Sequence, residues 1–435
     1  MDLRKRLSPL LTIGLVLSGC GPREANTAGP LPERMSRLAE AGDTVALADL
    51  ALAQCRRLDG VDRQSCYEDY FVALSDSGRV TLALGALDAL ADRDGRVKAD
   101  GHVYTHVIGI KAWTPGRDVA TVFASCNGLF QSGCYHGVIQ AYLTSDGGVD
   151  STEVAGLCDQ VEGSNQNRWL RFQCVHGIGH GLEMIWNWDL LRALQGCDWL
   201  TTGWDRQSCY GGAFMENAVA SMPNGHHASA RVLADQGGEA DHSGHSEHLD
   251  PAAITFKMRD SADALYPCSI VAARYWSACY MLQGGMILQR QGYDFDRAGA
   301  ECDKAPNGVR QFCYLSMGTM ASGMTVQNTR QTIRLCVSGH PDYRPWCFIG
   351  AVKNFIDVTA DPNDGIAFCR AVPPGKDKRQ CYVAVGEQIA VLHGDAPNRE
   401  KACARTPREG REECRYGAGL LATPPPGLPI LPGGS

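Results

Sequence analysis

Two pairs of histidines, each pair spaced four residues apart, are the side chains of this chain best suited to chemistry. The segment DGHVYTHVIGIKAW carries His102 and His106, and the segment CVHGIGHGLEMIW carries His176 and His180. Residues four apart lie on one face of a helix, one turn from each other. Both imidazoles of a pair can therefore reach the same metal ion, as in helical zinc and copper sites.

A fifth histidine occupies a matching position in a neighbouring segment. His136 is the second residue after Cys134, just as His176 is the second residue after Cys174. We predict that the five histidines form one site for copper or zinc, made by His102, His106, His136, His176 and His180. Two alternatives stay open: a polar or catalytic pocket without metal, and core histidines that donate to backbone carbonyls.

The sequence does not decide whether such a site would catalyse a reaction. Gly-Ile-Gly separates His176 from His180, so the glutamate that serves as general base in the HExxH motif of zinc proteases is absent. A redox or oxygen-dependent copper enzyme is compatible with the motifs, and so is a structural or metal-handling role. Glu183, Glu216 and Tyr104 are candidate partners that the sequence cannot place.

A second group of histidines falls in a polar insert, residues 223–251. The insert has little apolar periodicity, which predicts a loop. Its histidines could capture Zn(II), Cu(II) or Ni(II), or the insert could be a solvated loop that binds no metal; they are His226, His227, His242, His245 and His248. Met184, Met215 and Met222 are close in sequence and could suit Cu(I), although methionines on helices more often belong to the core.

The cysteines predict a framework of local disulfides. Of the 19 cysteines, Cys20 is set apart below, and the other 18 fall into pairs that mostly enclose about ten residues. The regular spacing favours nine local bridges, provided that the chain is exported to an oxidising compartment, as its first residues indicate below. The predicted pairs are Cys55 with Cys66, Cys126 with Cys134, Cys158 with Cys174, Cys197 with Cys209, Cys268 with Cys279, Cys302 with Cys313, Cys336 with Cys347, Cys369 with Cys381, and Cys403 with Cys414.

The pairs recur with a fixed period. The first cysteines of the last five pairs lie 34, 34, 33 and 34 residues apart, a spacing typical of stacked helical hairpins. In each unit a helix is expected to end at the first cysteine, as in DFDRAGAEC and ADALYPC, and a second helix to begin near the second cysteine. The sequence thus predicts an all-α solenoid of about ten hairpins, most of them bridged. The 71 residues from Cys55 to Cys126 indicate one hairpin without a bridge.

Two further positions repeat around the second cysteine. An aromatic residue usually follows it and is expected to wedge between hairpins. Arginine often lies three residues before it and could form an anion-binding ladder or a structural clasp to a nearby carboxylate or carbonyl. These arginines are Arg63, Arg171, Arg206, Arg310, Arg344 and Arg411.

The period, the helix-turn-helix pattern and the bridge in each unit resemble tetratricopeptide-like repeats, in particular the cysteine-clipped versions of secreted bacterial proteins. The resemblance covers roughly residues 35–420 and implies a curved solenoid with a concave face. The tetratricopeptide signature residues are absent, so no activity follows from the resemblance. A scaffold that binds a peptide or an envelope protein on the concave face is therefore the rival to a metal-binding function.

The first 20 residues have the pattern of an export signal. MDLRKRL is basic, LLTIGLVLSG is a short apolar run, and LSGC ends at Cys20. This resembles the lipobox of bacterial lipoproteins, which implies cleavage before Cys20, lipidation of Cys20 and anchorage to a membrane. Gly21 in place of aspartate favours the outer membrane over the inner one.

These features predict a division of the chain, and its charge restricts the partners. The expected segments are a signal peptide 1–19, a lipidated tether 20–34, histidine-bearing repeats 35–222, the insert 223–251, C-terminal repeats 252–421 and a Pro/Gly tail 422–435. The net charge of -7 argues against a nucleic-acid partner.

Overall fold

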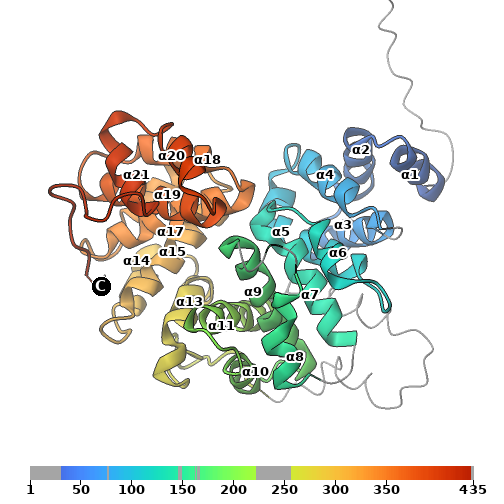
Figure 1. The fold of residues 1–435 in the computed structure, drawn as a ribbon, viewed down its shortest axis with the longest axis horizontal. Helices are drawn as coiled ribbons and strands as arrows, with labels where there is room; N and C mark the ends of the chain where they lie inside the picture. The colour runs from blue at the N-terminus through green and yellow to red at the C-terminus, as the bar shows by residue number, and fades with distance from the viewer. Residues whose placement is uncertain are drawn as a thin grey trace, which may run out of the picture.

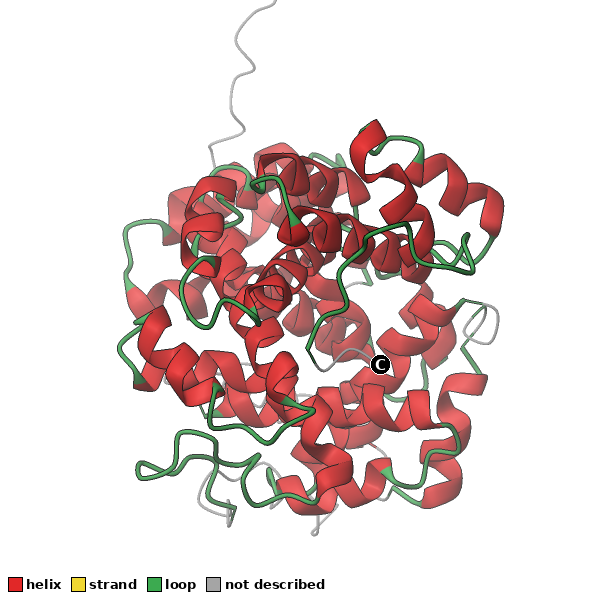
Figure 2. Cartoon of the chain, turned by 90° about the vertical axis from the view of Figure 1, so that its left-hand side faces the viewer, coloured by secondary structure: helices red, strands yellow, loops and turns green. Residues whose placement is uncertain are grey.

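A computed structural model describes residues 31–75, 78–145, 149–161, 163, 167–221 and 256–432 (Figure 1). These residues form an all-α protein without strands (Figure 2). Cys20 and the histidines of the predicted insert lie outside the described residues. Within the described ranges, no helix combines the length and apolar character needed to cross a membrane.

The helices pair into consecutive hairpins, as the repeat predicts. In every hairpin but the last, a short first helix is followed by a longer second helix. An amphipathic helix α1 (Leu31–Glu40) precedes the hairpins. It begins inside the segment predicted as tether, because Leu31, Met35 and Ala39 recur at helical spacing. The pairs are α2 (Thr44–Cys55) with α3 (Gly60–Ser75), α4 (Val80–Ala91) with α5 (Gly95–Ala112), α6 (Val119–Ala124) with α7 (Gly133–Ser145), α8 (Ser151–Gly156) with α9 (Arg168–Ile185), α10 (Leu190–Cys197) with α11 (Gly203–Ala220), α14 (Phe295–Cys302) with α15 (Arg310–Met324), α16 (Thr329–Cys336) with α17 (Arg344–Thr359), α18 (Pro362–Ala371) with α19 (Lys376–Leu392), and α20 (Ala396–Cys403) with α21 (Arg411–Gly417).

Side-chain caps fix where most of the first helices begin. An Asp or Asn accepts a hydrogen bond from a backbone N–H of the first turn, which satisfies a donor that the helix itself leaves unpaired. The capping residues of these helices are Asp43, Asp118, Asp150, Asp189, Asp294, Asn328, Asp361 and Asp395.

All nine predicted disulfides are present, which confirms the pairing that the spacing suggested. Each joins the end of the first arm to the start of the second, with Cα–Cα distances between 5.5 and 5.8 Å. The bonds join Cys55 to Cys66, Cys126 to Cys134, Cys158 to Cys174, Cys197 to Cys209, Cys268 to Cys279, Cys302 to Cys313, Cys336 to Cys347, Cys369 to Cys381, and Cys403 to Cys414. The hairpin of α4 and α5 has no bridge, as the 71-residue interval indicated.

One predicted helix is wrong. ADALYPC, residues 262–268, forms turns instead of a helix that ends at Cys268. Pro267 directly before the cysteine explains the difference, because proline lacks an N–H, clashes with the preceding helical turn and disfavours helical geometry in the residue before it. The second arm of this unit, α13 (Trp276–Arg290), is helical as expected.

The second helices of successive hairpins pack against one another at very short range. A Cβ built on Gly137 of α7 would lie 2.2 Å from the carbonyl oxygen of His106, and one on Gly212 would lie 2.0 Å from that of His176. Only glycine allows backbones to approach this closely. The aromatic residue after the second cysteine is buried between hairpins, as predicted, for example Tyr67 and Tyr382.

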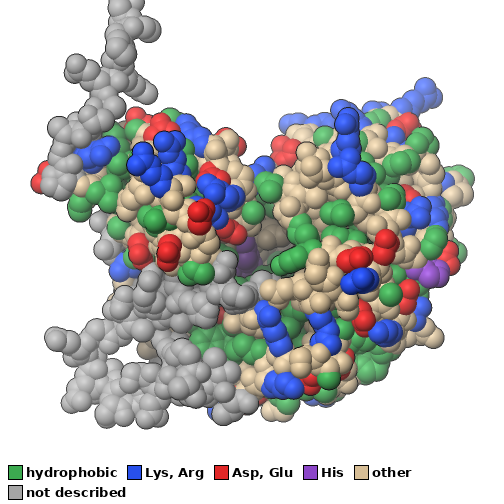
Figure 3. Space-filling view, turned by 180° about the vertical axis from the view of Figure 1, so that it is seen from behind, with side chains coloured by type: hydrophobic (Ala, Val, Ile, Leu, Met, Phe, Trp, Pro, Cys, Tyr) green, Lys and Arg blue, Asp and Glu red, His purple; other side chains and the backbone are tan. Residues whose placement is uncertain are grey.

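The solenoid curves until its C-terminal repeats meet its N-terminal ones. Helix α17 contacts the short helix η1 (Phe130–Ser132), and α19 contacts α9. Figure 1 shows the two ends of the chain on opposite sides, joined below by α9, α10, α11 and α13. Seen from behind, a hollow separates two lobes, and a histidine side chain is visible at its bottom (Figure 3).

The recurring arginines act as clasps where the structure gives their contacts. Arg171 donates to Asp205 and Asp159 at 2.8–2.9 Å, and Arg206 donates to the carbonyls of Leu200 and Thr201. These bonds tie the turn of one hairpin to its own second helix or to the next hairpin. They support the clasp in preference to an anion ladder.

The Pro/Gly tail does not continue the last helix, and it folds back over the C-terminal repeats. The backbone carbonyls of Pro429 and Pro432 accept hydrogen bonds from Gln380 and Trp346 at 2.7 and 2.9 Å. Residues 422–432 thus pack against α17 and α19.

Candidate metal centre

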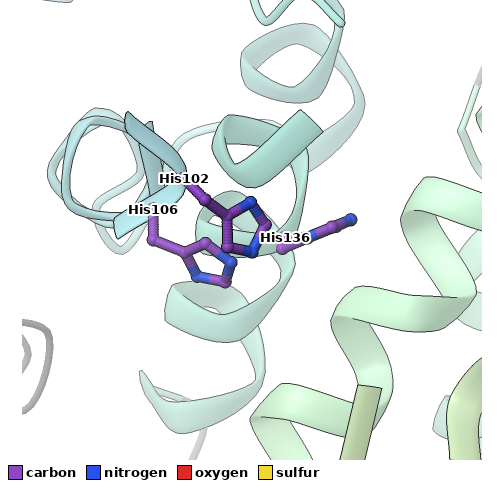
Figure 4. Close-up of side chains that lie close together, drawn as sticks. All are labelled: His102, His106 and His136. Carbon is purple, nitrogen blue, oxygen red and sulfur yellow. The ribbon is translucent and has the colours of Figure 1, made fainter. Parts of the chain in front are cut away.

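Five histidines from three successive second helices meet in one cluster. His102 and His106 come from α5, His136 from α7, and His176 and His180 from α9. Figure 4 shows the side chains of the first three close together. The ring centroids of His102 and His106 lie 4.6 Å apart, those of His106 and His180 lie 4.8 Å apart, and those of His136 and His176 lie 4.7 Å apart.

Three of these histidines occupy equivalent positions of the repeat. Gly137 and Gly212 each lie three residues after a second cysteine, and they contact the carbonyls of His106 and His176 respectively. His106 therefore occupies, in the hairpin of α4 and α5, the position that His176 occupies in the hairpin of α8 and α9. Tyr104 takes the place of the second cysteine in the hairpin of α4 and α5. The sequence had aligned only His136 with His176, because the hairpin of α4 and α5 has no cysteine to mark the register.

The paired cysteines support this cluster and do not join it as ligands. A metal-binding cysteine must be a thiolate, and each cysteine of the nine pairs is held in a disulfide. Cys134 and Cys174 lie on the ligand-bearing helices α7 and α9, two residues before a histidine. The other second cysteines lie on helices that carry none of the five histidines: Cys66, Cys209, Cys279, Cys313, Cys347, Cys381 and Cys414.

Each of the five rings uses one nitrogen for a hydrogen bond to an oxygen of the protein. Four rings use Nδ1, and His136 uses Nε2. The bonds run from His102 Nδ1 to the carbonyl of Phe130 at 2.9 Å, from His106 Nδ1 to Gln140 Oε1 at 3.4 Å, from His136 Nε2 to Gln173 Oε1 at 2.9 Å, from His176 Nδ1 to the carbonyl of Ser208 at 3.2 Å, and from His180 Nδ1 to Glu216 Oε2 at 2.8 Å.

These bonds determine the tautomer of each ring. A carbonyl or carboxylate oxygen only accepts, so in the neutral ring the bonded nitrogen carries the proton and the other nitrogen carries the lone pair. Nδ1 of His136 and Nε2 of His176 are buried and have no hydrogen-bond partner among the described residues. A buried polar atom without a partner is costly, and coordination of a metal ion is one way to satisfy it.

His136 and His176 are held in the neutral form that metal binding requires. Burial lowers the pKa of His136 well below its usual value of 6.5, and the neighbouring histidines lower it further. Burial and His180 lower the pKa of His176 in the same way. At neutral pH a metal ion would thus find lone pairs without first displacing protons.

Two buried carboxyl groups lie behind His180. Glu216 of α11 accepts from His180 and from the indole Nε1 of Trp188, the latter at 3.3 Å, and it is 0 % exposed. Glu183 is also 0 % exposed, and neither of its oxygens has a hydrogen-bond partner in the described part of the chain. Burial and the negative charge of Glu216 raise the pKa of Glu183 well above its usual range.

Gln140 joins the cluster to one of the candidate methionines. Its amide oxygen accepts from His106, while its amide nitrogen donates to the sulfur of Met184. Met184 thus supports Gln140, which in turn orients His106. Met215 lies on α11, and Met222 lies outside the described residues.

Four of the five histidines are buried, and His102 is partly exposed. His102 is therefore the member of the cluster most accessible to solvent. Burial of four histidines excludes most water from a bound ion, and the partly exposed His102 leaves one side where a small molecule can approach.

The described residues contain two groups that could hold a metal ion, and both include His136. One is His102, His106 and His136, and the other is His136, His176 and His180; within each group the ligand atoms lie within 4.8 Å of one another. Three imidazoles suit Cu and Zn, and a set of three protein ligands leaves a position for solvent or substrate.

Comparisons with known protein families, with curated proteins and with solved structures find no match to this chain in any of the three.

Proposed function

We propose that this chain is an exported, lipid-anchored protein whose helical solenoid carries a copper or zinc centre. The observation that supports the proposal is the set of five fixed tautomers, each with one nitrogen bonded to the protein and the other bearing a lone pair within the cluster. Core histidines without a ligand would need partners for those lone-pair nitrogens, and His136 and His176 have none among the described residues.

The bound ion would act as a Lewis acid or as a redox centre within the histidine cluster. The histidines would hold it, and Phe130, Gln140, Gln173, Ser208 and Glu216 would keep each ring in place. Such hydrogen-bonded supports commonly change metal affinity or activity by about 10- to 100-fold when they are removed. The open coordination position and the partly exposed His102 favour a reactive centre over a closed structural one.

The membrane anchor rests on the sequence pattern LSGC at Cys20. The nine disulfides fit it, because such bridges persist in oxidising compartments such as the periplasm and the cell surface. In a bacterial host, the wild-type chain is expected to incorporate labelled palmitate and to sediment with outer-membrane vesicles. Cys20→Ala should abolish both, and unchanged membrane association of that variant would refute the anchor.

Metal content tests the centre. The oxidised protein without its signal peptide is purified and analysed by elemental mass spectrometry, beside a variant with His136→Ala and His176→Ala. We expect at least one copper or zinc ion per chain in the wild type and a clearly lower metal content in this variant. A matched control removes two histidines outside the cluster, His340 and His393, and should keep the metal.

The loop histidines need their own control. Substitution of His226, His227, His242, His245 and His248 by asparagine should leave the metal of the helical cluster in place. Metal that is lost with the loop and kept by the His136→Ala/His176→Ala variant would contradict the proposed centre.

A scaffold that binds a peptide or envelope protein on its concave face is the rival function. The two functions differ in what they require of the histidines, which a scaffold would leave on separate faces. Their convergence within ligand distance therefore favours the metal centre.

A further inference from the structure

The cluster contains more ligands than one ion can use. Zinc sites in proteins take three or four ligands, whereas five imidazoles converge here. The pair His102 and His106 and the pair His176 and His180 belong to different groups, and only His136 is common to both.

We infer that the cluster binds two transition-metal ions side by side, one at each histidine pair, with His136 completing one of the two sites. This inference rests on the proposed metal-binding function. It assigns His102 and His106 to the ion on the side of the partly exposed His102, and His176 and His180 to the deeper ion.

His136 can serve only one ion at a time. Its Nε2 is 2.9 Å from Gln173 Oε1, so Nδ1 is the single nitrogen that it offers. Two bound ions would therefore have three and two histidine ligands. Both would retain positions for an exogenous ligand, which would be a small molecule able to reach the cluster past the partly exposed His102.

The close packing of the pairs allows two neighbouring ions. The rings of His106 and His180, which come from different pairs, have centroids 4.8 Å apart, and those of His136 and His180 lie 5.5 Å apart. Two-metal sites in enzymes place their ions about 3.5–4 Å apart. The two pairs are thus near enough for their ions to share one small exogenous ligand.

The carboxyl groups behind His180 would supply counter-charge for the deeper ion. Neutral imidazoles do not offset the charge of a buried cation, and a buried charge needs a counter-charge. Glu216 supplies one negative charge through its bond to His180. Glu183, fully buried and without a hydrogen-bond partner among the described residues, is a second acidic group in the same region. As carboxylates, the two groups would match the two positive charges of one divalent ion at the deeper site.

Metal stoichiometry tests the inference. The parent protein is the full mature chain with the five loop histidines replaced by asparagine, so that only the helical cluster can take up ions. It is loaded with excess Zn(II) or Cu(II), desalted and analysed for metal and protein. We expect two ions per chain in the parent.

Two pair variants then locate the ions. His102→Ala/His106→Ala and His176→Ala/His180→Ala should each bind fewer than two ions, and one ion is expected for each. His340→Ala/His393→Ala, which removes two histidines outside the cluster, should keep two. Circular dichroism and thermal unfolding of each variant show that the solenoid is intact.

The outcomes separate the inference from the function on which it rests. One ion in the parent would overturn the inference and leave the proposed metal centre in place. No ion in the parent would overturn both, and two ions retained by either pair variant would place a metal outside the cluster and overturn the inference.

If a pair variant fails to fold, the parent protein alone can still show whether two ions lie next to each other. After loading with Cu(II), the copper seen by electron paramagnetic resonance is compared with the total copper. Two adjacent coupled ions should give a signal smaller than the total, and isolated ions would give the full signal and contradict adjacency.

Discussion

Glu216 Oε2 lies 2.8 Å from His180 Nδ1, and both side chains are 0 % exposed. The two residues belong to neighbouring hairpins and are 36 positions apart, so the bond exists only because α9 and α11 pack together. It makes Nδ1 the protonated nitrogen of His180 and Nε2 the one able to bind metal. It also places a buried negative charge directly behind a proposed ligand.

Replacement of Glu216 by glutamine should weaken metal binding without removing it. Glutamine keeps the shape and an acceptor oxygen but loses the charge, so metal affinity should fall by about 10- to 100-fold. Competition against a chromophoric chelator measures the change. The surface substitution Glu412→Gln is the control, and equal affinity of Glu216→Gln and wild type would contradict the role of the carboxylate.

The metal-free protein should lose stability as the pH falls from 7 toward 5. His136 and His176 have pKa values well below 6.5 in the folded state, so the unfolded chain binds more protons below about pH 6.5. Each such group costs up to about 1.4 kcal/mol per pH unit between its unfolded and folded pKa values. Above pH 6.5 the two groups are neutral in both states and contribute no pH dependence.

Denaturant unfolding at several pH values measures this effect. A His136→Asn/His176→Asn variant should show a smaller loss of stability at acidic pH than wild type. The difference between the two proteins isolates the histidines from Glu183, whose raised pKa acts in the opposite direction above about pH 4.5. If the free energy of unfolding depends on pH in the same way in both proteins, the two histidines are not buried as neutral rings.

Gly212→Ala should destabilise the solenoid and disturb the cluster. The added Cβ would lie 2.0 Å from the carbonyl oxygen of His176, so α9 and α11 must separate. Overpacking of this kind costs about 1–3 kcal/mol or more, and metal affinity should fall with it because His176 moves. Thermal unfolding and chelator competition measure the two effects.

Gly323→Ala provides the matched helical control. A Cβ at this position meets nothing within 4 Å, so the change should be neutral or stabilise the protein by up to about 1 kcal/mol. Equal changes in the free energy of unfolding for the two substitutions would show that the close helix contact at Gly212 does not require glycine.

The bridge between Cys158 and Cys174 should matter for both stability and metal binding. It ends two residues before His176, so it fixes the part of α9 that carries two of the proposed ligands. Its removal by alanine substitution should cost about 3 kcal/mol in the chain-entropy account. Removal of the bridge between Cys403 and Cys414 should cost a similar amount but leave metal affinity unchanged, and equal metal loss in both variants would contradict a local effect.

Much of the fold was predictable from the sequence because the repeat is marked by covalent chemistry. Paired cysteines, capping Asp residues and a period near 34 residues locate the hairpins without knowledge of their packing. The prediction failed at ADALYPC, where the cysteine pattern suggested a helix and Pro267 opposed it. There the local backbone restriction of proline outweighed the repeat.

The histidines of the site were predictable, and the residues that orient them were not. Pairs four apart can be read from the sequence, but Gln140, Gln173 and Ser208 reach their histidines from 32 to 37 residues away. This separation is about one repeat, so these contacts follow only when the stacking of the hairpins is known. Glu216 was named from the sequence as a candidate, and its partner His180 became evident only in the structure.

The position of His106 within its repeat was also not predictable from the cysteine spacing. Its unit has Tyr104 where other units have the second cysteine. The available signal was Gly109, which lies five residues after Tyr104, just as Gly179 and Gly318 lie five residues after a second cysteine. In the structure, all three contact the carbonyl of the next unit's second cysteine.

The most direct test of the metal centre is a crystal structure of the metal-loaded protein with diffraction data collected at the absorption edge of that metal. The account predicts anomalous density among the five rings, about 2.0–2.1 Å from the lone-pair nitrogens of the histidines. Ordered rings with no anomalous density among them, or density only elsewhere in the chain, would contradict it.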